Sequence, residues 1–307
     1  MYDFGLIVFE SLVLPFSYFF SPEKRLFIGY LLTSICMAYW VYRREAHVGF
    51  FQYLLPREHW LGQSARVDIQ LVFVNAAVKV ALLGQLFIYG LHLAFFVTDI
   101  LLLKWGPMDT PLSSFGAIWL FAVASTVLGD CTVYWVHVAF HRIPWLWDIH
   151  KVHHSATTLN PVTQLRIHPI ELVVHNVRAT MVFGILAGLM DYLSGGKAPP
   201  MTLVGVNFFG VLFFAWGANL RHSHIRLSYW HFLEYVLISP TQHQIHHSRD
   251  PKHHNRNYGS KLALWDWMFG TLCTSRNETK ITVGLDEESQ EYRTTTRALL
   301  RPFRSWI

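Results

Sequence analysis

The sequence predicts an all-α, polytopic helical membrane protein, with about four to five membrane helices and a histidine-rich helical cap on the cytoplasmic side. Three observations support this fold class. First, 52% of the 307 residues are hydrophobic and only 15% are charged, whereas soluble chains carry about 25% charged residues. Second, five apolar stretches are candidate membrane elements. Third, many of the 18 histidines cluster in the polar segments that separate or follow these stretches.

The N-terminal stretch at residues 4–20 is apolar but lacks the features of a cleaved signal peptide. Asp3 and Glu10 stand where a basic region is expected, and no small-residue cleavage site follows. We expect this stretch to be a membrane anchor or an interfacial helix. Residues 1–70 are therefore interpreted as an N-terminal anchor followed by a cytoplasmic linker.

The candidate membrane elements are residues 26–42, 71–103, 115–136, 170–193 and 201–218. The second is longer than the roughly 20 residues that a span needs. We expect it to tilt, to extend out of the bilayer or to kink near Gly84 or Gly90.

The distribution of basic residues predicts the orientation. Arginines and lysines concentrate in residues 43–70, 137–169 and 219–307, whereas the connections 104–114 and 194–200 carry one lysine each. Basic loops stay on the cytoplasmic side, so two membrane hairpins, 71–136 and 170–218, join three cytoplasmic segments. An even number of crossings returns the chain to the same side, and histidines of the last two segments can therefore meet.

Three histidine motifs have the spacing of one helical face. They are HVAFH (137–141), HKVHH (150–154) and HQIHH (243–247). Side chains at i, i+3 and i+4 point the same way on a helix. Two HxxHH motifs arise by accident in roughly 0.2% of chains with this histidine content. With one further histidine after the fifth stretch, the predicted metal ligands are His137, His141, His150, His153, His154, His222, His243, His246 and His247.

The number of ligands predicts two metal ions. A catalytic zinc ion takes three protein ligands and a structural one takes four, so nine imidazoles exceed what one ion needs. Imidazole suits zinc, copper, iron and nickel alike, and the spacing leaves the metal open. The three cysteines form no CxxC pair, which excludes a zinc ribbon or an iron–sulfur site. The sequence contains no compact basic stripe of the kind that would indicate nucleic-acid binding.

The residues around these motifs resemble the fatty acid hydroxylase/sterol desaturase superfamily. The first two boxes are similar within DCTVYWVHVAFHRIPWLWDIHKVHHS (130–155), and the third within SPTQHQIHHSRDPKHHNRNYGSKLALWDWMFGTL (239–272). RIHPIE (166–171) and HSHIRL (222–227) resemble intervening signatures. The resemblance covers about residues 70–290. One departure is that Arg226 follows His222 at the position where some members carry a second histidine.

The resemblance implies a membrane-bound enzyme with two iron ions, which zinc can replace, and with O2 as co-substrate. The implied reaction is hydroxylation of a lipid alkyl or sterol substrate taken from the bilayer, and desaturation at the same site is the alternative. A zinc-binding membrane transporter is a further alternative from another class. Electrons would come from an external cytochrome b5-type or ferredoxin/reductase donor. The implied location is a bacterial inner membrane or the endoplasmic reticulum.

Other polar residues are candidates for supporting roles. Asp130 lies seven residues before His137, so we expect its carboxylate to orient that imidazole. Glu171 and His175 share a helical face and could do the same for another ligand. The roles of His168, His224, His253 and His254 stay open. In this interpretation residues 71–275 form the catalytic membrane domain, and residues 276–307 form a polar C-terminal tail.

Overall fold

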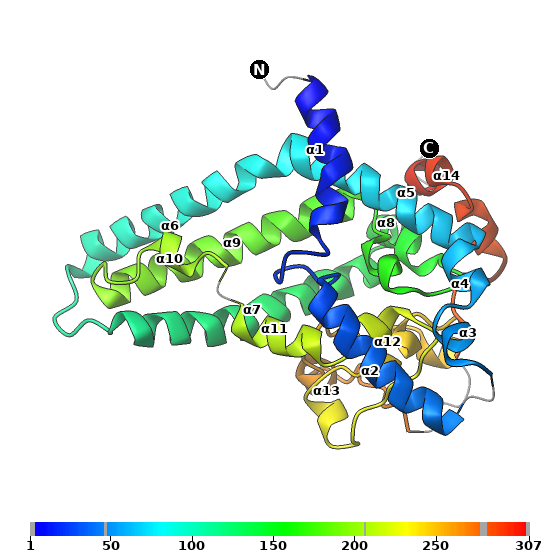
Figure 1. Ribbon diagram of the computed structural model, residues 1–307. Coiled ribbons are helices and arrows are strands. Elements are labelled where there is room, and N and C mark those ends of the chain that lie inside the picture. Colours follow the sequence, from blue (N-terminus) through cyan, green and yellow to red (C-terminus); the bar gives the residue numbers. More distant parts are fainter. Residues whose placement is uncertain (1–3, 46–47, 206, 277–280, 305–307) are drawn as a thin grey trace.

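The computed structural model describes residues 4–45, 48–205, 207–276 and 281–304, and its regular elements are helices (Figure 1). Within these ranges the β-structure is limited to two isolated bridges, Leu237–Leu262 and Ser248–Val283. The predicted all-α class is confirmed. The longer helices are α1 (Phe4–Ser17), α2 (Ile28–Glu45), α5 (Gln63–Val78), α6 (Gly84–Trp105), α7 (Ser114–Arg142), α8 (Pro144–His154), α9 (Pro169–Ser194) and α14 (Thr295–Arg304).

Short helices and turns complete the chain. They are α3 (Phe50–Leu54), α4 (Arg57–Leu61), α10 (Pro200–Leu203), α11 (Phe208–Ala215), α12 (Pro240–His246) and α13 (Leu264–Met268), with a π turn at Lys79–Leu83 and 3-10 turns at Pro161–Leu165, Ala218–His222, Leu233–Tyr235, Pro251–His253 and Asp286–Tyr292.

Three helices of the described chain, α6, α7 and α9, are long and apolar enough to cross a membrane. They lie side by side and project from the rest of the molecule (Figure 1). At 1.5 Å per residue, the 29 residues of α7 span about 44 Å, which exceeds a hydrocarbon core of about 30 Å. α7 is therefore longer than one crossing needs, and its last turns carry polar side chains.

Close packing of α6 on α9 depends on small residues. Gly184 and Gly188 of α9 face the backbone of α6, and a Cβ atom at Gly188 would collide with the carbonyl oxygen of Ala94. This small-xxx-small spacing is a common way for membrane helices to approach each other. Thr98 of α6 donates a hydrogen bond to Asp191 Oδ2 of α9 at 3.0 Å. This bond fixes the register between α6 and α9.

The predicted stretch 71–103 is divided between two helices. The chain leaves α5, passes through the π turn at Lys79–Leu83 and continues as α6 from Gly84. The kink expected near Gly84 is confirmed, since a π turn locally breaks the α-helical hydrogen-bond pattern. Only α6 belongs to the membrane bundle, while α5 packs beside the histidine-bearing cap.

Two of the predicted spans are wrong. Residues 201–218 form α10 and α11, of four and eight residues, because Gly205 adopts the left-handed conformation with φ 80° and breaks the helix. Residues 26–42 lie in α2, but its 18 residues end in Arg43, Arg44 and Glu45, and it is not apolar enough for a span. Three long apolar helices are therefore found where four to five were predicted.

The cap lies at one end of the bundle (Figure 1). It contains α8, α12 and the turn Ala218–His222, and α5 and the C-terminal residues cover it. Tyr292 and Ala298 are buried against Val67, Leu71 and Val152. The segment that contains Tyr292 and Ala298 is thus anchored on the cap, although the domain boundaries at 70 and 275 stay predictions. The 14 residues of α1, about 21 Å in length, are too few to cross a bilayer.

Candidate metal centre

Four elements carry the predicted metal ligands, and their ends converge. The last two turns of α7 present His137 and His141. Pro144 starts α8 at its first position, which a helix tolerates without loss of a hydrogen bond, and α8 presents the second box. Ser239 caps α12 through a capping box with Gln242, which fixes the direction of the third box. His222 ends the 3-10 turn that follows α11.

These elements bring all nine predicted histidines into two groups whose candidate ligand atoms lie within 4.8 Å of one another. The first site, as we call it, contains His137, His141, His150, His154 and His246. The second site contains His153, His222, His243 and His247. The two sites are adjacent, because the rings of His154 and His247 stack with centroids 4.7 Å apart. The predicted convergence of three distant segments at one place is therefore found, and metal binding by these residues stays a prediction.

The Nε2 atoms point inward in both sites. In the second site, Nε2 of His222 lies 3.1 Å from Nε2 of His243 and 3.4 Å from Nε2 of His153. In the first site, Nε2 atoms of His137 and His150 are 3.1 Å apart. Nitrogens each about 2.1 Å from a shared ion lie about 3.0–3.4 Å apart. The separations therefore match those around a metal ion.

The outward Nδ1 atoms are held by acceptors. His137 Nδ1 donates to the carbonyl oxygen of Tyr258 at 2.7 Å, His153 Nδ1 to that of Arg166 at 3.0 Å, and His246 Nδ1 to that of Arg256 at 2.8 Å. A proton on Nδ1 leaves the lone pair on Nε2, where it can bind a metal. The fold thus selects the ligating tautomer of these rings.

A carboxylate performs the same role for His150. Its Nδ1 lies 2.9 Å from Glu171 Oε1, and both side chains are buried. Carboxylate–histidine pairs of this kind orient metal ligands and increase their basicity. The contact with His150 therefore supports the predicted role of Glu171. His175 Nε2 lies 3.8 Å from the same oxygen, and its side chain is partly exposed.

Burial keeps these imidazoles neutral. Burial lowers the pKa of His153 to about 4, and it lowers those of His154, His222 and His247 well below the ordinary value, with neighbouring histidines adding to the effect. A histidine binds metal only as the neutral ring. The environment of the sites therefore favours the form that a metal needs.

Buried histidine nitrogens without a hydrogen-bond partner indicate whether these residues are suited to bind metal ions. Nε2 of His141, His154 and His246 is buried and has no hydrogen-bond partner among the described residues. Buried polar atoms are nearly always satisfied, so three orphaned lone pairs in one site require a ligand. The donor set, its spacing and its protonation fit a pair of metal ions.

The predicted contact between Asp130 and His137 is wrong. The carboxylate of Asp130 accepts hydrogen bonds from the backbone N–H groups of Lys261 and Leu262, at 2.9 Å each, and from Trp265 Nε1 at 3.2 Å. A fully buried aspartate takes these donors because the loop after Gly259 folds against α7. Asp130 therefore supports the loop that carries the His137 acceptor.

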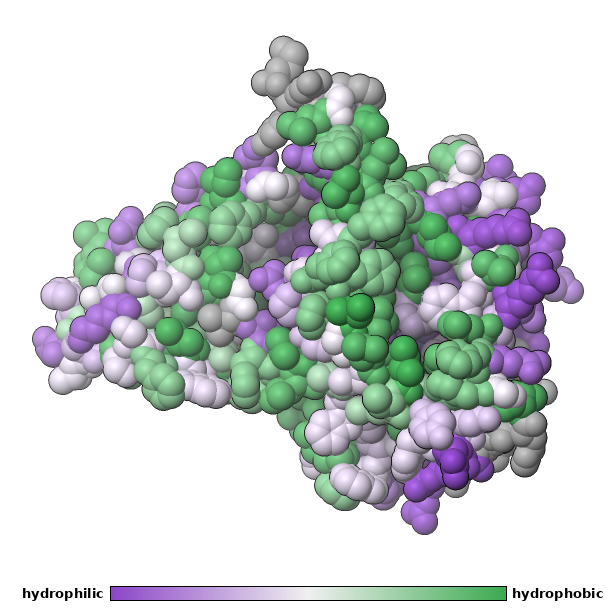
Figure 2. Space-filling view, viewed as in Figure 1, coloured by the Kyte–Doolittle hydropathy of each residue, from purple (hydrophilic) through white to green (hydrophobic). Residues whose placement is uncertain are grey.

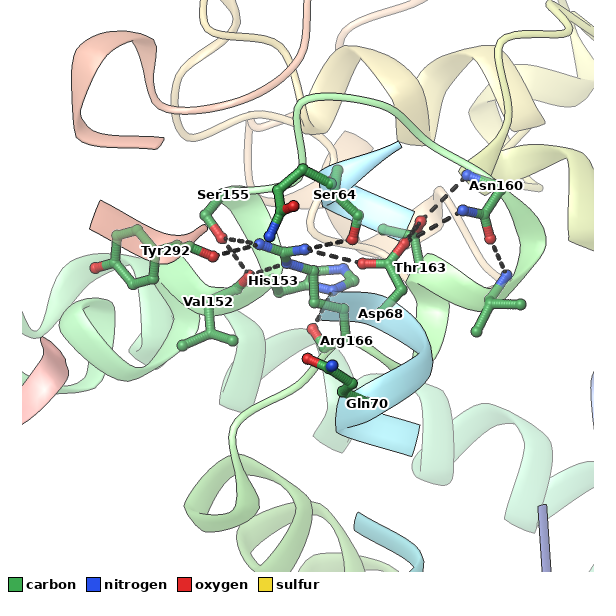
Figure 3. A network of polar contacts seen from close by, with 12 residues as sticks. Ser64, Asp68, Gln70, Val152, His153, Ser155, Asn160, Thr163, Arg166 and Tyr292 are labelled. Atoms are coloured by element: carbon green, nitrogen blue, oxygen red, sulfur yellow. Dashed lines mark hydrogen bonds and ion pairs between the residues drawn. The ribbon is translucent and has the colours of Figure 1, made fainter. Parts of the chain in front are cut away.

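A buried network supports the second site from outside (Figure 3). Arg166, whose carbonyl holds His153, pairs with Asp68 at 3.0 Å. Its guanidinium also donates to the carbonyl of Val152 at 2.8 Å and to Ser155 Oγ at 2.8 Å. The sequence offers little signal for Asp68, because it lies in α5, 98 residues before Arg166.

The histidines with open roles lie outside both sites. His168 caps α9, accepting from the N–H of Ile170 at 3.2 Å. His224 lies 2.7 Å from the carbonyl of Tyr53, as expected for a side chain that points away from His222. His253 is buried elsewhere in the cap, and exposed His254 lines a cavity described next.

Two cavities reach the histidines by different routes. A cavity of about 440 Å³ contacts His137, His150, His153, His222 and His243 and is lined by residues of the membrane bundle and of the α1–α2 connection. A second, of about 380 Å³, contacts His141, His154 and His246 and is lined by the C-terminal residues 284–288. The centre therefore has one approach beside the bundle and another through the cap.

Known proteins share the part of the chain that forms this centre. Residues 122–271 match the family model described as fatty acid hydroxylase. An alkylglycerol monooxygenase of Xenopus tropicalis is 27% identical over 74% of this chain and 45% of its own. An ornithine lipid hydroxylase of Rhizobium tropici is 26% identical over 53% of this chain and 45% of its own.

A Delta(7)-sterol-C5(6)-desaturase of Nicotiana tabacum is 28% identical over 50% of this chain and 49% of its own. The chain spans less than half the length of these three relatives. No solved structure matches it.

Proposed function

The chain belongs to the fatty acid hydroxylase family, and from this premise we propose that it is a membrane enzyme that hydroxylates a lipid with O2 at a pair of iron ions. The observation that carries the proposal is the convergence of nine histidines, seven of them buried, in two adjacent groups at the end of a membrane bundle. The names of the relatives, which include lipid hydroxylases, support a lipid as the substrate.

In this proposal each ion has its own set of imidazoles. The first site offers five and the second site four. When bound, the iron ions supply the reduction of O2 and the oxidation of a substrate C–H bond, chemistry that side chains alone do not provide. Zinc would fit the same nitrogens, since imidazole binds both metals.

The protein's own task is to hold the rings still. Tyr258, Arg166 and Arg256 offer backbone carbonyls to Nδ1 atoms, and Glu171 offers a carboxylate. His243 differs, because its Nδ1 lies 2.9 Å from the guanidinium of Arg221. A guanidinium only donates, so in the metal-free protein the neutral ring accepts on Nδ1 and carries its proton on Nε2. Binding of a metal at Nε2 as a neutral ring would require the other tautomer, with the proton on Nδ1.

The substrate is proposed to enter through the 440 Å³ cavity, because bundle residues line it. The second approach is lined mainly by residues of the cap and of the C-terminal segment, and it is proposed to serve solvent and an external electron donor. The centre is proposed to lie on the cytoplasmic side, which the concentration of basic residues in the polar segments supports.

Desaturation is the second candidate, because one relative is a sterol desaturase. Both reactions begin with removal of a hydrogen atom from the lipid chain, and they differ in the product. Mass spectrometry of lipids from cells with and without the gene separates the two candidates. A product heavier by one oxygen atom supports hydroxylation, and one lighter by two hydrogens supports desaturation. An unchanged lipid profile, with zinc transport by the purified protein in vesicles, would contradict both.

A further inference from the structure

The cavity beside the bundle carries an unusual charge for a site that takes a lipid. Six cationic side chains and two carboxylates line it together with six histidines, of which five belong to the two metal sites. The cationic residues are Lys24, Arg25, Lys79, Arg178, Arg221 and Lys261. The carboxylates are Glu23 and Glu171, and Glu171 is already engaged by His150. The cavity is therefore strongly positive before any metal ion is added.

Most of these cations have no counter-ion in the part of the chain that the structure describes. Lys261 lies 3.9 Å from Asp130 Oδ1, whereas no carboxylate lies within 4.0 Å of the side-chain nitrogens of Arg25 or Arg221. Arg221 is only 3% exposed, and its Nε has no hydrogen-bond partner. Buried charges are normally paired or bound to a ligand. Asp130 is a buried carboxylate whose charge also acts on Arg25, Arg178 and Arg221, and the cations of the cavity outnumber it.

A second buried arginine shows how the same fold treats a purely structural charge. Arg166 is 1% exposed, pairs with Asp68 at 3.0 Å and has its other donors satisfied (Figure 3). Arg221 is buried to a similar degree and donates to the carbonyl of Ser260 and to His243 Nδ1, but no described carboxylate pairs with it and its Nε has no partner. The difference indicates that Arg221 and its neighbours are arranged for something that is absent from the chain itself.

The cationic groups are close enough to act together. Arg25, Arg221 and Lys261 line the same cavity, and burial together with the charges of Arg25, Arg178 and Arg221 lowers the pKa of Lys261. Like charges in mutual contact destabilise one another, and an anion between them relieves this repulsion. Charge-assisted hydrogen bonds from guanidinium groups to phosphate or carboxylate are among the strongest that proteins form.

Apolar residues complete the cavity wall. Leu26, Val133, Leu165 and Phe214 line the same space as the cations and the histidines. In Figure 2 a recess with hydrophilic surface lies beside the α1–α2 segment, and hydrophobic surface surrounds it. Such a combination suits an amphipathic molecule whose charged end and first carbon atoms enter together.

We propose that this cavity binds the anionic head group of the substrate lipid, a phosphate or carboxylate, through Arg25, Arg221 and their cationic neighbours. The proposal rests on the proposed function, since it names the class of lipid that the iron site oxidises. Because the cations and five metal-site histidines line one cavity of about 440 Å³, the oxidised carbon lies a few bonds from the head group and far from the chain terminus.

The test compares two lipids that differ in the head group alone. Iron-loaded protein in detergent micelles is equilibrated with equal amounts of dioleoylphosphatidate and dioleoylglycerol, and the bound lipids are quantified by mass spectrometry. We expect phosphatidate to be retained in preference by about tenfold or more. Arg25→Gln should reduce this ratio by about the same factor, because it removes an unpaired cation from the cavity. A purely structural defect would lower the retention of both lipids and leave the ratio unchanged.

Arg43→Gln is the matched control, since Arg43 is exposed at the end of α2 and away from the cavity. Its ratio should equal that of the wild type. Equal binding of the two lipids by the wild type, or an unchanged ratio in Arg25→Gln, would overturn the proposal. Equal binding of the two lipids combined with saturable binding of inorganic phosphate would assign the cations to a free anion, which also overturns it.

Turnover is measured separately on the same preparations. Lipid oxidation without a head-group preference leaves the proposed function standing and overturns the head-group site. A head-group preference that depends on Arg25, without oxidation of either lipid or of cell-derived lipids, supports the head-group site and contradicts the proposed oxidation.

Discussion

His137 Nδ1 lies 2.7 Å from the carbonyl oxygen of Tyr258, a residue 121 positions later in the chain. The ring of Tyr258 is fully buried and also faces His141 and His246. One loop residue therefore orients a ligand from α7 and packs against two other ligands. The geometry of the first site depends on that loop, and the carboxylate of Asp130 holds the loop through its backbone N–H groups.

Asp130→Asn tests this dependence. The amide replaces one acceptor oxygen with a donor, so a backbone N–H of Lys261 or Leu262 loses its partner. We expect a loss of about 1–3 kcal/mol in unfolding free energy and a decrease in iron affinity of about 10–100-fold. Thermal unfolding and metal titration measure the two effects. Asp109→Asn, in an exposed turn, is the control, and wild-type iron affinity in Asp130→Asn would contradict the supporting role.

Glu171→Ala tests the carboxylate behind His150. Removing the acceptor leaves the buried Nδ1 of His150 without a partner and its ring free to rotate. Iron affinity or lipid turnover should fall by about 10–100-fold. Glu171→Gln keeps an acceptor oxygen and should lose less than Glu171→Ala. Equal, undiminished activity in both variants would show that His150 needs no orientation from this residue.

Asp68→Asn tests the buried ion pair outside the second site. The pair with Arg166 is almost fully buried, so neutralising the aspartate leaves an uncompensated charge. We expect destabilisation by about 3–5 kcal/mol, measured by chemical or thermal unfolding. The exposed pair of Arg249 and Asp286 provides the control, since Asp286→Asn should change stability by less than about 1 kcal/mol. Similar values for the two variants would show that burial does not govern the effect.

The stability of the metal-free protein should decrease in mild acid. Burial lowers the folded-state pKa of His153 to about 4, below the ordinary value of about 6.5. The unfolded chain therefore takes up a proton first as the pH falls below about 6.5, and it is favoured increasingly down to about pH 4. Unfolding of the metal-free protein at pH 7.5 and at pH 5 measures this, and iron loading should shift the loss to lower pH. Equal stability at both values would contradict burial of neutral rings.

The candidate ligands could be predicted because local geometry encodes them. The i, i+3 and i+4 spacing places three imidazoles on one face of α8 and of α12. The even number of crossings expected between them predicted that both helices lie at the same end of the bundle. They do lie there, although the chain returns from α9 through the short helices α10 and α11 and not through a second long apolar helix. His222 is identified by its place after the last apolar stretch. None of this requires knowledge of tertiary contacts.

Several features could not be predicted, for physical reasons that differ. The acceptor for His137 is a backbone carbonyl, and every residue carries one, so Tyr258 gives no signal for this role. Asp130 shares a helical face with His137, but its carboxylate accepts hydrogen bonds from the N–H groups of a loop that is distant in the sequence. Hydropathy alone marks residues 201–218 as one span, whereas the left-handed conformation at Gly205 divides them.

The central claim is that two ions occupy two separate groups of histidines, and iron stoichiometry tests it most directly. The account predicts two irons per chain for the wild type. His246→Ala in the first site and His153→Ala in the second should each reduce the number while the protein still inserts into membranes. His224→Ala, a histidine outside both sites, should retain two. One iron or none in the fully loaded wild type, or two irons retained in both site variants, would contradict the account.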